Sequence, residues 1–147
     1  MSQAYLSHYV HFVFSTKGRM RTIHDKHKEQ LWAYLHGIAK NIGCRTLAIR
    51  GMEDHVHLLV EVPATLSLAK IVATLKSNSS RWMREKSPAF TWQRGYGAFS
   101  VSASNLPAVK EYIHGQEAHH KKRDYKAEFI ALLKKHDVEY DPRYVFD

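Results

Sequence analysis

Two histidines separated by one residue, His55 and His57, are the side chains of this sequence best suited to holding a metal ion. They lie in the segment EDHVHLLVEV, whose alternate positions are aliphatic, as in a strand with one buried face. Both imidazoles then project from the opposite, open face of the sheet, where two ring nitrogens can bind one ion. Because the His-x-His spacing is common by chance, an ordinary pair of surface histidines is the alternative interpretation.

A second candidate group lies further along the chain, on a predicted helix over residues 106–121. Tyr112 and Gln116 are four residues apart and share one face of that helix, with His120 one turn beyond. The Gln116 carbonyl oxygen can complete a metal site begun by two histidines, and the Tyr112 hydroxyl can be aimed at a group that the metal polarises. On a helix that also carries apolar residues, packing is the alternative role for Tyr112.

Hydrophobic periodicity predicts the elements that must position these residues. Alternation indicates strands, and three- and four-residue spacing indicates helices. The predicted strands are 8–15, 44–50, 55–62 and 98–102, and the predicted helices are 24–42, 68–86 and 106–121, with a short helix in the tail 124–147. This order predicts an α+β fold of the ferredoxin-like or RRM-like split βαβ kind: an antiparallel sheet with two helices on one face, and an added C-terminal helix that carries Tyr112. The other sheet face is expected to be open.

Composition limits the class of protein. The chain has 147 residues, 44% of them hydrophobic, and one cysteine, which argues for a single domain over residues 1–147 without a disulfide or a cysteine-based zinc site. We expect a core at about 5–121 and an extension at 122–147. No segment has the length of an apolar membrane span and no signal peptide is recognisable, so we expect a cytoplasmic protein with no membrane partner.

The net charge of +8 favours an anionic partner, nucleic acid first. Basic residues that can follow a phosphate backbone occur on the helix at 68–86 and just after the tyrosine helix: Lys70, Lys76, Arg81, Arg84, Lys121, Lys122 and Arg123. Trp92 and Tyr96 can either stack on unpaired bases or pack within their own loop.

The segments DHVHLLV, WQRGYGAFSVSAS and VKEYIHGQEAHH, taken together and in this order, resemble the HUH-type single-tyrosine transposases of single-strand DNA insertion sequences. This is the IS200-like kind, which includes the REP-associated tyrosine transposases, and the resemblance extends over roughly residues 5–121. It implies that His55, His57 and Gln116 bind a divalent metal and that Tyr112 is the nucleophile. Gly115 departs from the pattern, because many relatives carry a polar residue there.

The resemblance implies a metal-dependent transposase that cleaves and rejoins single-stranded DNA at hairpin-marked ends through a 5′-phosphotyrosine. It also implies a homodimer whose composite sites pair the histidines of one subunit with the tyrosine of the other. Two imidazoles alone favour zinc or another transition metal, whereas the resemblance implies Mg²⁺ or Mn²⁺, which we adopt. A neutral His-His-Gln set is then expected to bind metal weakly without DNA. The base for Tyr112 is left open, with His114 and His120 as weak candidates.

Two rival functions remain. A histidine-triad nucleotide hydrolase needs a third alternating histidine at position 59, which is Leu59 here. A non-catalytic single-stranded nucleic-acid binder or regulator derived from a transposase predicts DNA binding without a covalent adduct. The intact set of His55, His57, Tyr112 and Gln116 argues against it.

Overall fold

The fold is that of a computed structural model, which describes residues 4–120 and 123–147. Its strands are β1 (Tyr9–Ser15), β2 (Arg45–Met52), β3 (His55–Glu61) and β4 (Gly97–Val101). Its helices are α1 (Asp25–Asn41), α2 (Leu68–Arg84), α3 (Leu106–His114), α4 (Gln116–His120) and α5 (Tyr125–Lys135). Short 3-10 turns cover Lys17–Arg19 and Ala103–Asn105.

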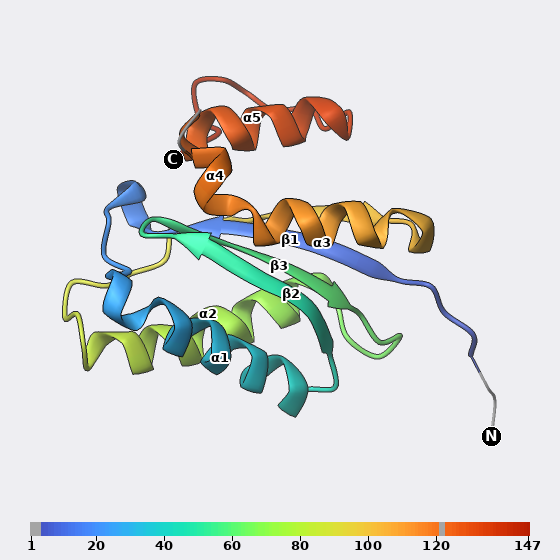
Figure 1. Cartoon of the computed structure of the whole chain (residues 1–147), viewed down its shortest axis with the longest axis horizontal. Helices are drawn as coiled ribbons and strands as arrows, with labels where there is room; N and C mark the ends of the chain where they lie inside the picture. The colour runs from blue at the N-terminus through green and yellow to red at the C-terminus, as the bar shows by residue number, and fades with distance from the viewer. Residues whose placement is uncertain (1–3, 121–122) are drawn as a thin grey trace.

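The four strands form one antiparallel sheet in the order β2-β3-β1-β4. Helices α1 and α2 cover one face of this sheet, and α3, α4 and α5 lie over the other (Figure 1). The predicted α+β fold and its split βαβ order are therefore confirmed. The alternation predicted the strands correctly because the alternate residues Val10, Phe12 and Phe14 of β1 all pack in the core under α1 and α2.

The main core lies between the sheet and helices α1 and α2. Val10, Phe12 and Phe14 of β1 point into it, as their alternation predicts, and meet Leu35 of α1 and Leu75 of α2. Ser67 caps α2 by accepting a hydrogen bond from the Lys70 backbone N–H at 3.1 Å.

The second face of the sheet is not open, and the expectation that it would be is wrong. Val13 of β1 and Phe99 of β4 point to this side and pack against apolar side chains of α5, chiefly Phe129, Leu132 and Leu133. Burying these rings removes apolar surface from water and holds the C-terminal helix on the sheet. Residues on this face, including the two histidines, are consequently enclosed.

Two local features set the position of the candidate site. The β2–β3 hairpin requires glycine at position 51, because a Cβ there would lie 2.1 Å from the carbonyl oxygen of His55. The predicted helix 106–121 is interrupted: α3 ends at His114, and Gly115 has φ −92° and ψ 18° before α4 begins at Gln116. Tyr112 and Gln116 therefore lie on two short helices on either side of a break.

Among the described residues, no helix has both the length and the apolar composition needed to cross a membrane.

Candidate active site

The two histidines of β3 are fully buried between the sheet and the C-terminal helices, with 0% exposure each. Each ring has a partner on its Nδ1 atom. Asp54 Oδ1 lies 2.7 Å from His55 Nδ1, and His11 Nε2 lies 2.8 Å from His57 Nδ1. Partners on Nδ1 fix the ring orientations, so both Nε2 atoms face the same space under α4 and α5.

Three further side chains meet the histidines in that space. Gln116 Oε1 lies 3.1 Å from His55 Nε2, and its Nε2 donates to Glu128 Oε2 at 3.1 Å. Glu128 Oε1 lies 2.9 Å from His57 Nε2 and 3.5 Å from His55 Nε2. The Tyr112 hydroxyl donates a hydrogen bond to the other carboxylate oxygen, Glu128 Oε2. All four residues predicted from the sequence are thus brought together within one chain.

Glu128 is the member of this cluster that the sequence analysis missed. It belongs to α5, which was expected to lie beyond the core motifs, yet its side chain is 1% exposed. One signal was available: Glu128 shares a helix face with Tyr125 and Leu132, at spacings of three and four residues. A carboxylate on the apolar face of a helix is buried with a partner far more often than alone.

The donor set fits a divalent metal. One ligand atom from each of His55, His57 and Glu128 can be chosen so that all lie within 4.8 Å of one another. The Gln116 amide oxygen adds a possible fourth donor beside His55. The carboxylate supplies a negative charge that the predicted His-His-Gln set lacked, which makes the site more suitable for Mg²⁺ or Mn²⁺ than the sequence suggested.

The electrostatics of the cluster follow from its burial. Burial is the largest cause of a raised pKa of Tyr112, and the neighbouring Glu128 carboxylate raises it further. Gln116 and Arg123 act in the opposite direction. Burial also holds the pKa of His11 well below its usual value, with His57 as the next cause, so His11 is a neutral partner. If His57 presents a lone pair at Nε2, its proton is on Nδ1, and His57 donates to His11 Nε2.

The basic residues predicted on the helix at 68–86 are not brought to this cluster. Helix α2, which carries exposed Lys70, Arg81 and Arg84, packs on the opposite face of the sheet. Lys76 is partly buried, and its ammonium donates to the backbone carbonyls of Gln93 at 2.8 Å and Gly95 at 2.6 Å. Lys76 thus holds the loop before β4.

The other residues predicted to contact DNA lie in different parts of the structure. Trp92 packs in the core, where its Nε1–H donates to Ser79 Oγ at 2.9 Å, whereas Tyr96 is 40% exposed. Arg123 is exposed and close enough to influence Tyr112. Lys121, Lys122 and the side chain of His120 lie outside the described residues.

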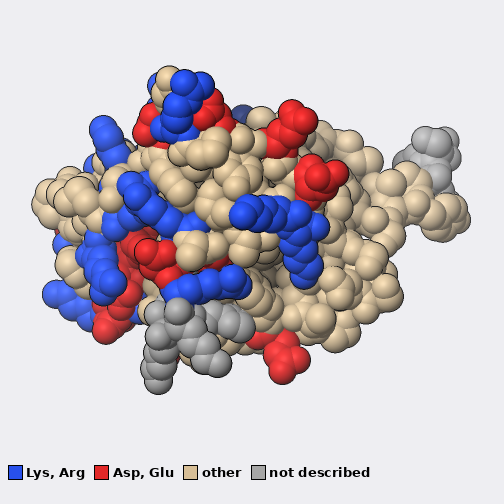
Figure 2. Space-filling view, turned by 90° about the horizontal axis from the view of Figure 1, so that it is seen from above, with Lys and Arg blue, Asp and Glu red and all other residues tan. Residues whose placement is uncertain are grey.

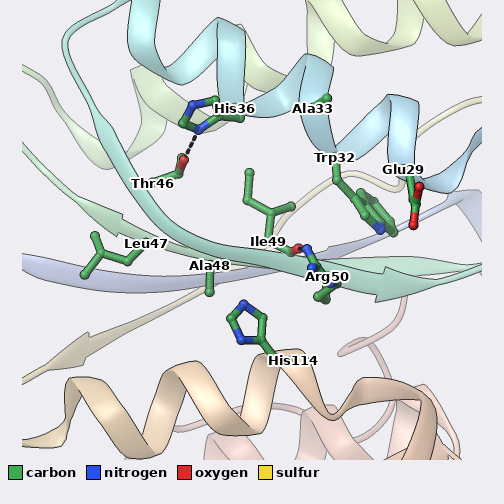
Figure 3. A pocket seen from close by; sticks show the side chains of 10 residues that line it. All are labelled: Glu29, Trp32, Ala33, His36, Thr46, Leu47, Ala48, Ile49, Arg50 and His114. Atoms are coloured by element: carbon green, nitrogen blue, oxygen red, sulfur yellow. Dashed lines mark hydrogen bonds between the residues drawn. The ribbon is translucent and has the colours of Figure 1, made fainter.

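Pockets adjoin the sheet at its β2 edge. One, of about 440 Å³, is lined by α1, β2 and His114 of α3, whose ring points towards β2 (Figure 3). A second, of about 810 Å³, shares Arg50 and His114 with it and reaches Gln116. Its charges are largely balanced, since Lys28 pairs with Asp25 at 2.8 Å and Glu53 at 2.9 Å. The His114 ring lies on this edge, and no described hydrogen bond links it to Tyr112.

A family model described as "Transposase IS200 like" matches residues 4–116, which is most of the chain. The chain belongs to the IS200-like transposase family. It is 25% identical over 114 residues to the transposase for insertion sequence element IS200 of Salmonella typhimurium, covering 72% of this chain and 74% of the relative. It is equally similar, over 114 residues, to the ISDra2 transposase TnpA of Deinococcus radiodurans, of which 81% is covered.

Solved structures agree with this family membership. A crystal structure at 1.90 Å of a Deinococcus radiodurans protein assigned as a transposase superposes with a TM-score of 0.63 and 26% identity, covering 79% of this chain and 96% of that one. A REP-associated tyrosine transposase bound to a REP hairpin superposes with a TM-score of 0.62, covering 82% of this chain and 74% of that one. At 12% identity, the latter supports the fold of this IS200-like transposase.

Proposed function

We propose that this IS200-like transposase is a metal-dependent enzyme that cleaves and rejoins single-stranded DNA at hairpin-marked element ends through a 5′-phosphotyrosine. One observation carries the proposal: the Tyr112 hydroxyl bonds to a carboxylate that also contacts His57 and lies near His55. A potential nucleophile, a proton acceptor and a set of metal donors thus lie together in one cluster. The hairpin held by the REP-associated relative supports the choice of substrate.

The chemistry is transesterification at a DNA phosphodiester. A bond forms between the Tyr112 oxygen and phosphorus, the bond from phosphorus to the 3′ oxygen breaks, and that oxygen takes up a proton to leave as a 3′-hydroxyl. Glu128 Oε2, which already accepts the Tyr112 hydrogen bond, is the atom suited to receive the phenolic proton. Mg²⁺ or Mn²⁺ bound by His55, His57, Glu128 and Gln116 would polarise the scissile phosphate and stabilise charge on the leaving oxygen.

The decisive experiment is a denaturing-gel assay for a covalent protein–DNA adduct. End-labelled single-stranded oligonucleotides from the flanks of the gene are incubated with Mg²⁺, Mn²⁺ or EDTA, using wild type and Tyr112→Phe. We expect an adduct that requires both metal and Tyr112, and unchanged hairpin binding by the variant, since the substitution removes one oxygen. Cleavage by Tyr112→Phe would disprove the nucleophile, and binding without any adduct from wild type would favour the regulatory binder.

We further propose that Tyr112 acts with the histidines of its own chain, because its ring centroid lies 5.9 Å from that of His57 within one chain. A homodimer with exchanged tyrosines is the alternative that the family resemblance implies. Mixing Tyr112→Phe with His57→Ala protein separates the two. Recovery of adduct formation in the mixture would demonstrate exchange, whereas an inactive mixture is expected for a site within one chain.

A further inference from the structure

A pocket of about 300 Å³ lies on the side of Tyr112 away from the β2 edge, between β4, α3 and α5. Its polar lining comes from four separate parts of the chain, and we call it the tyrosine-side pocket. Its polar and charged lining side chains include His11, Asn105, Tyr112, Arg123, Lys135 and His136. A volume of this size is at the small end for ligand sites, so the pocket can take one nucleotide but not a duplex.

The lining charges of this pocket have one sign. Arg123 and Lys135 are its permanent cations, and no Asp or Glu occurs among the described residues that line it. Arg123 acts on Tyr112 in the direction that lowers its pKa, and Lys135 acts in the same direction on the pKa of His11. Both cations are therefore close enough to influence the pKa values of Tyr112 and His11, which line the inner wall of the pocket. This contrasts with the charge-balanced pocket at the β2 edge.

The remaining wall is held by side-chain contacts and is partly apolar, which suits a sugar or base. The His136 ring stacks on Phe99 at 4.5 Å, and its Nδ1 donates to the Leu132 carbonyl at 2.9 Å. Val109 and Leu132 complete the apolar side. The face of the molecule over α5 also bears Lys and Arg side chains on the left and centre of Figure 2, with Asp and Glu side chains among them.

We propose that the tyrosine-side pocket holds the nucleotide adjoining the phosphodiester that Tyr112 attacks, with Arg123 and Lys135 contacting its phosphate. This rests on the proposed function. A strand in this pocket passes beside the Tyr112 ring, as in-line attack on the neighbouring phosphate requires. Arg123, Lys135 and His136 all follow residue 116, where the family match ends, so the cationic side of this subsite comes from the C-terminal part of the chain.

The test measures binding rather than cleavage, in a Tyr112→Phe parent that cannot form the adduct. The affinity for the single-stranded hairpin oligonucleotide is measured by fluorescence anisotropy at several salt concentrations, with Lys135→Ala, Arg123→Ala and Lys135→Arg added to the parent. Lys134→Ala is the matched control, because Lys134 is exposed on the same helix and is not among the residues that line the pocket. Thermal melting verifies that each variant folds.

We expect Lys135→Ala and Arg123→Ala each to reduce the slope of log affinity against log salt by about 0.7, one phosphate contact on a single strand. Lys135→Arg and Lys134→Ala should keep the parental slope. In a second assay, a neutral methylphosphonate replaces one phosphate at a time along the oligonucleotide. In the parent protein, the replacement beside the cleavage site should weaken binding. In Lys135→Ala, the same replacement should cause no further loss of affinity.

Two results would overturn the proposal in distinguishable ways. Equal loss of slope in Lys134→Ala and Lys135→Ala would mean that α5 contributes only a diffuse positive field, while DNA binding and the proposed function stand. Failure of the parent to bind any single-stranded oligonucleotide from the gene flanks would remove the proposed function and this subsite together.

Discussion

At the scale of single residues, Glu128 joins the two parts of the candidate chemistry. One of its carboxylate oxygens faces the histidines, and the other accepts the hydrogen bond of Tyr112. Removing its charge therefore affects both the metal donor set and the acceptor of the phenolic proton. A glutamate that only stabilised the fold would not contact both the histidines and the Tyr112 hydroxyl.

Glu128→Gln should lower the rate of adduct formation by about 10²-fold or more, because an amide neither receives the proton nor supplies the negative charge. Single-turnover assays with Mn²⁺ give the rate, and anisotropy should show DNA binding close to wild type. Glu111→Gln, at an exposed position of α3, is the control. A wild-type rate in Glu128→Gln would exclude the carboxylate from the chemistry.

His57 has a structural role in addition to its proposed one. The sequence analysis placed His57 on an open sheet face, but the ring is fully buried and contacts His11 and Glu128. We expect His57→Ala to lower the free energy of unfolding by about 1–3 kcal/mol, since it removes a partner from two buried polar groups. Urea unfolding of His57→Ala, with exposed His114→Ala alongside, measures this, and identical midpoints would contradict it.

At the scale of elements, helix α5 depends on a glycine in the sheet. A Cβ at Gly97 of β4 would lie 2.8 Å from Phe129 Cε2 and 3.0 Å from Phe99 Cε2. Both rings belong to the cluster that holds α5 on the sheet. Any side chain at position 97 therefore pushes on the helix that carries Glu128.

Gly97→Ala should destabilise the protein by about 1–3 kcal/mol through overpacking, and should slow adduct formation because Glu128 moves with α5. Gly37→Ala is the matched control: its Cβ meets nothing within 4 Å in α1, so it should stabilise by about 0.5–1 kcal/mol. Chemical denaturation and the adduct assay test both. Gly97→Ala should lower the free energy of unfolding and Gly37→Ala should raise it. A stabilised Gly97→Ala would refute the packing argument.

At the scale of the whole molecule, stability depends on pH partly through Lys76. Burial lowers the pKa of Lys76 from 10.5 to about 8. Between these values the unfolded chain binds more protons than the folded chain, so this lysine makes stability rise with pH across that window. The raised pKa values of Tyr112 and Tyr125, chiefly due to burial, act oppositely above pH 10.

Lys76→Met should remove this contribution while the tyrosines remain in both proteins. From pH 8 to 10, the unfolding free energy of wild type should therefore rise relative to that of Lys76→Met. The slope should be well below the about 1.4 kcal/mol per pH unit of a full proton difference, because Lys76 is only partly buried. Urea titrations at half-unit pH steps measure it, and a constant difference would contradict the assignment.

Much of the molecule was predictable because its signals are local. Alternation and helical spacing predicted the strands and helices, and His55, His57, Tyr112 and Gln116 were found from spacing and resemblance. The covered sheet face and Glu128 were not, because contacts between β1 and α5 join residues more than 100 positions apart. Val13 and Phe99, two apolar residues on a face expected to be open, were the unused signal for a covering helix.

The order of α5 after the sheet and α3 in the sequence has a consequence for biosynthesis. Translation completes the sheet, both histidines and Tyr112 before it reaches Glu128 and Lys135. A product that stops before α5 retains the basic helix α2 but lacks the carboxylate beside Tyr112 and a cationic wall of its pocket. A premature stop codon between the codons for Arg123 and Glu128 would thus leave most of the chain's Lys and Arg residues in place while removing Glu128 from the candidate site.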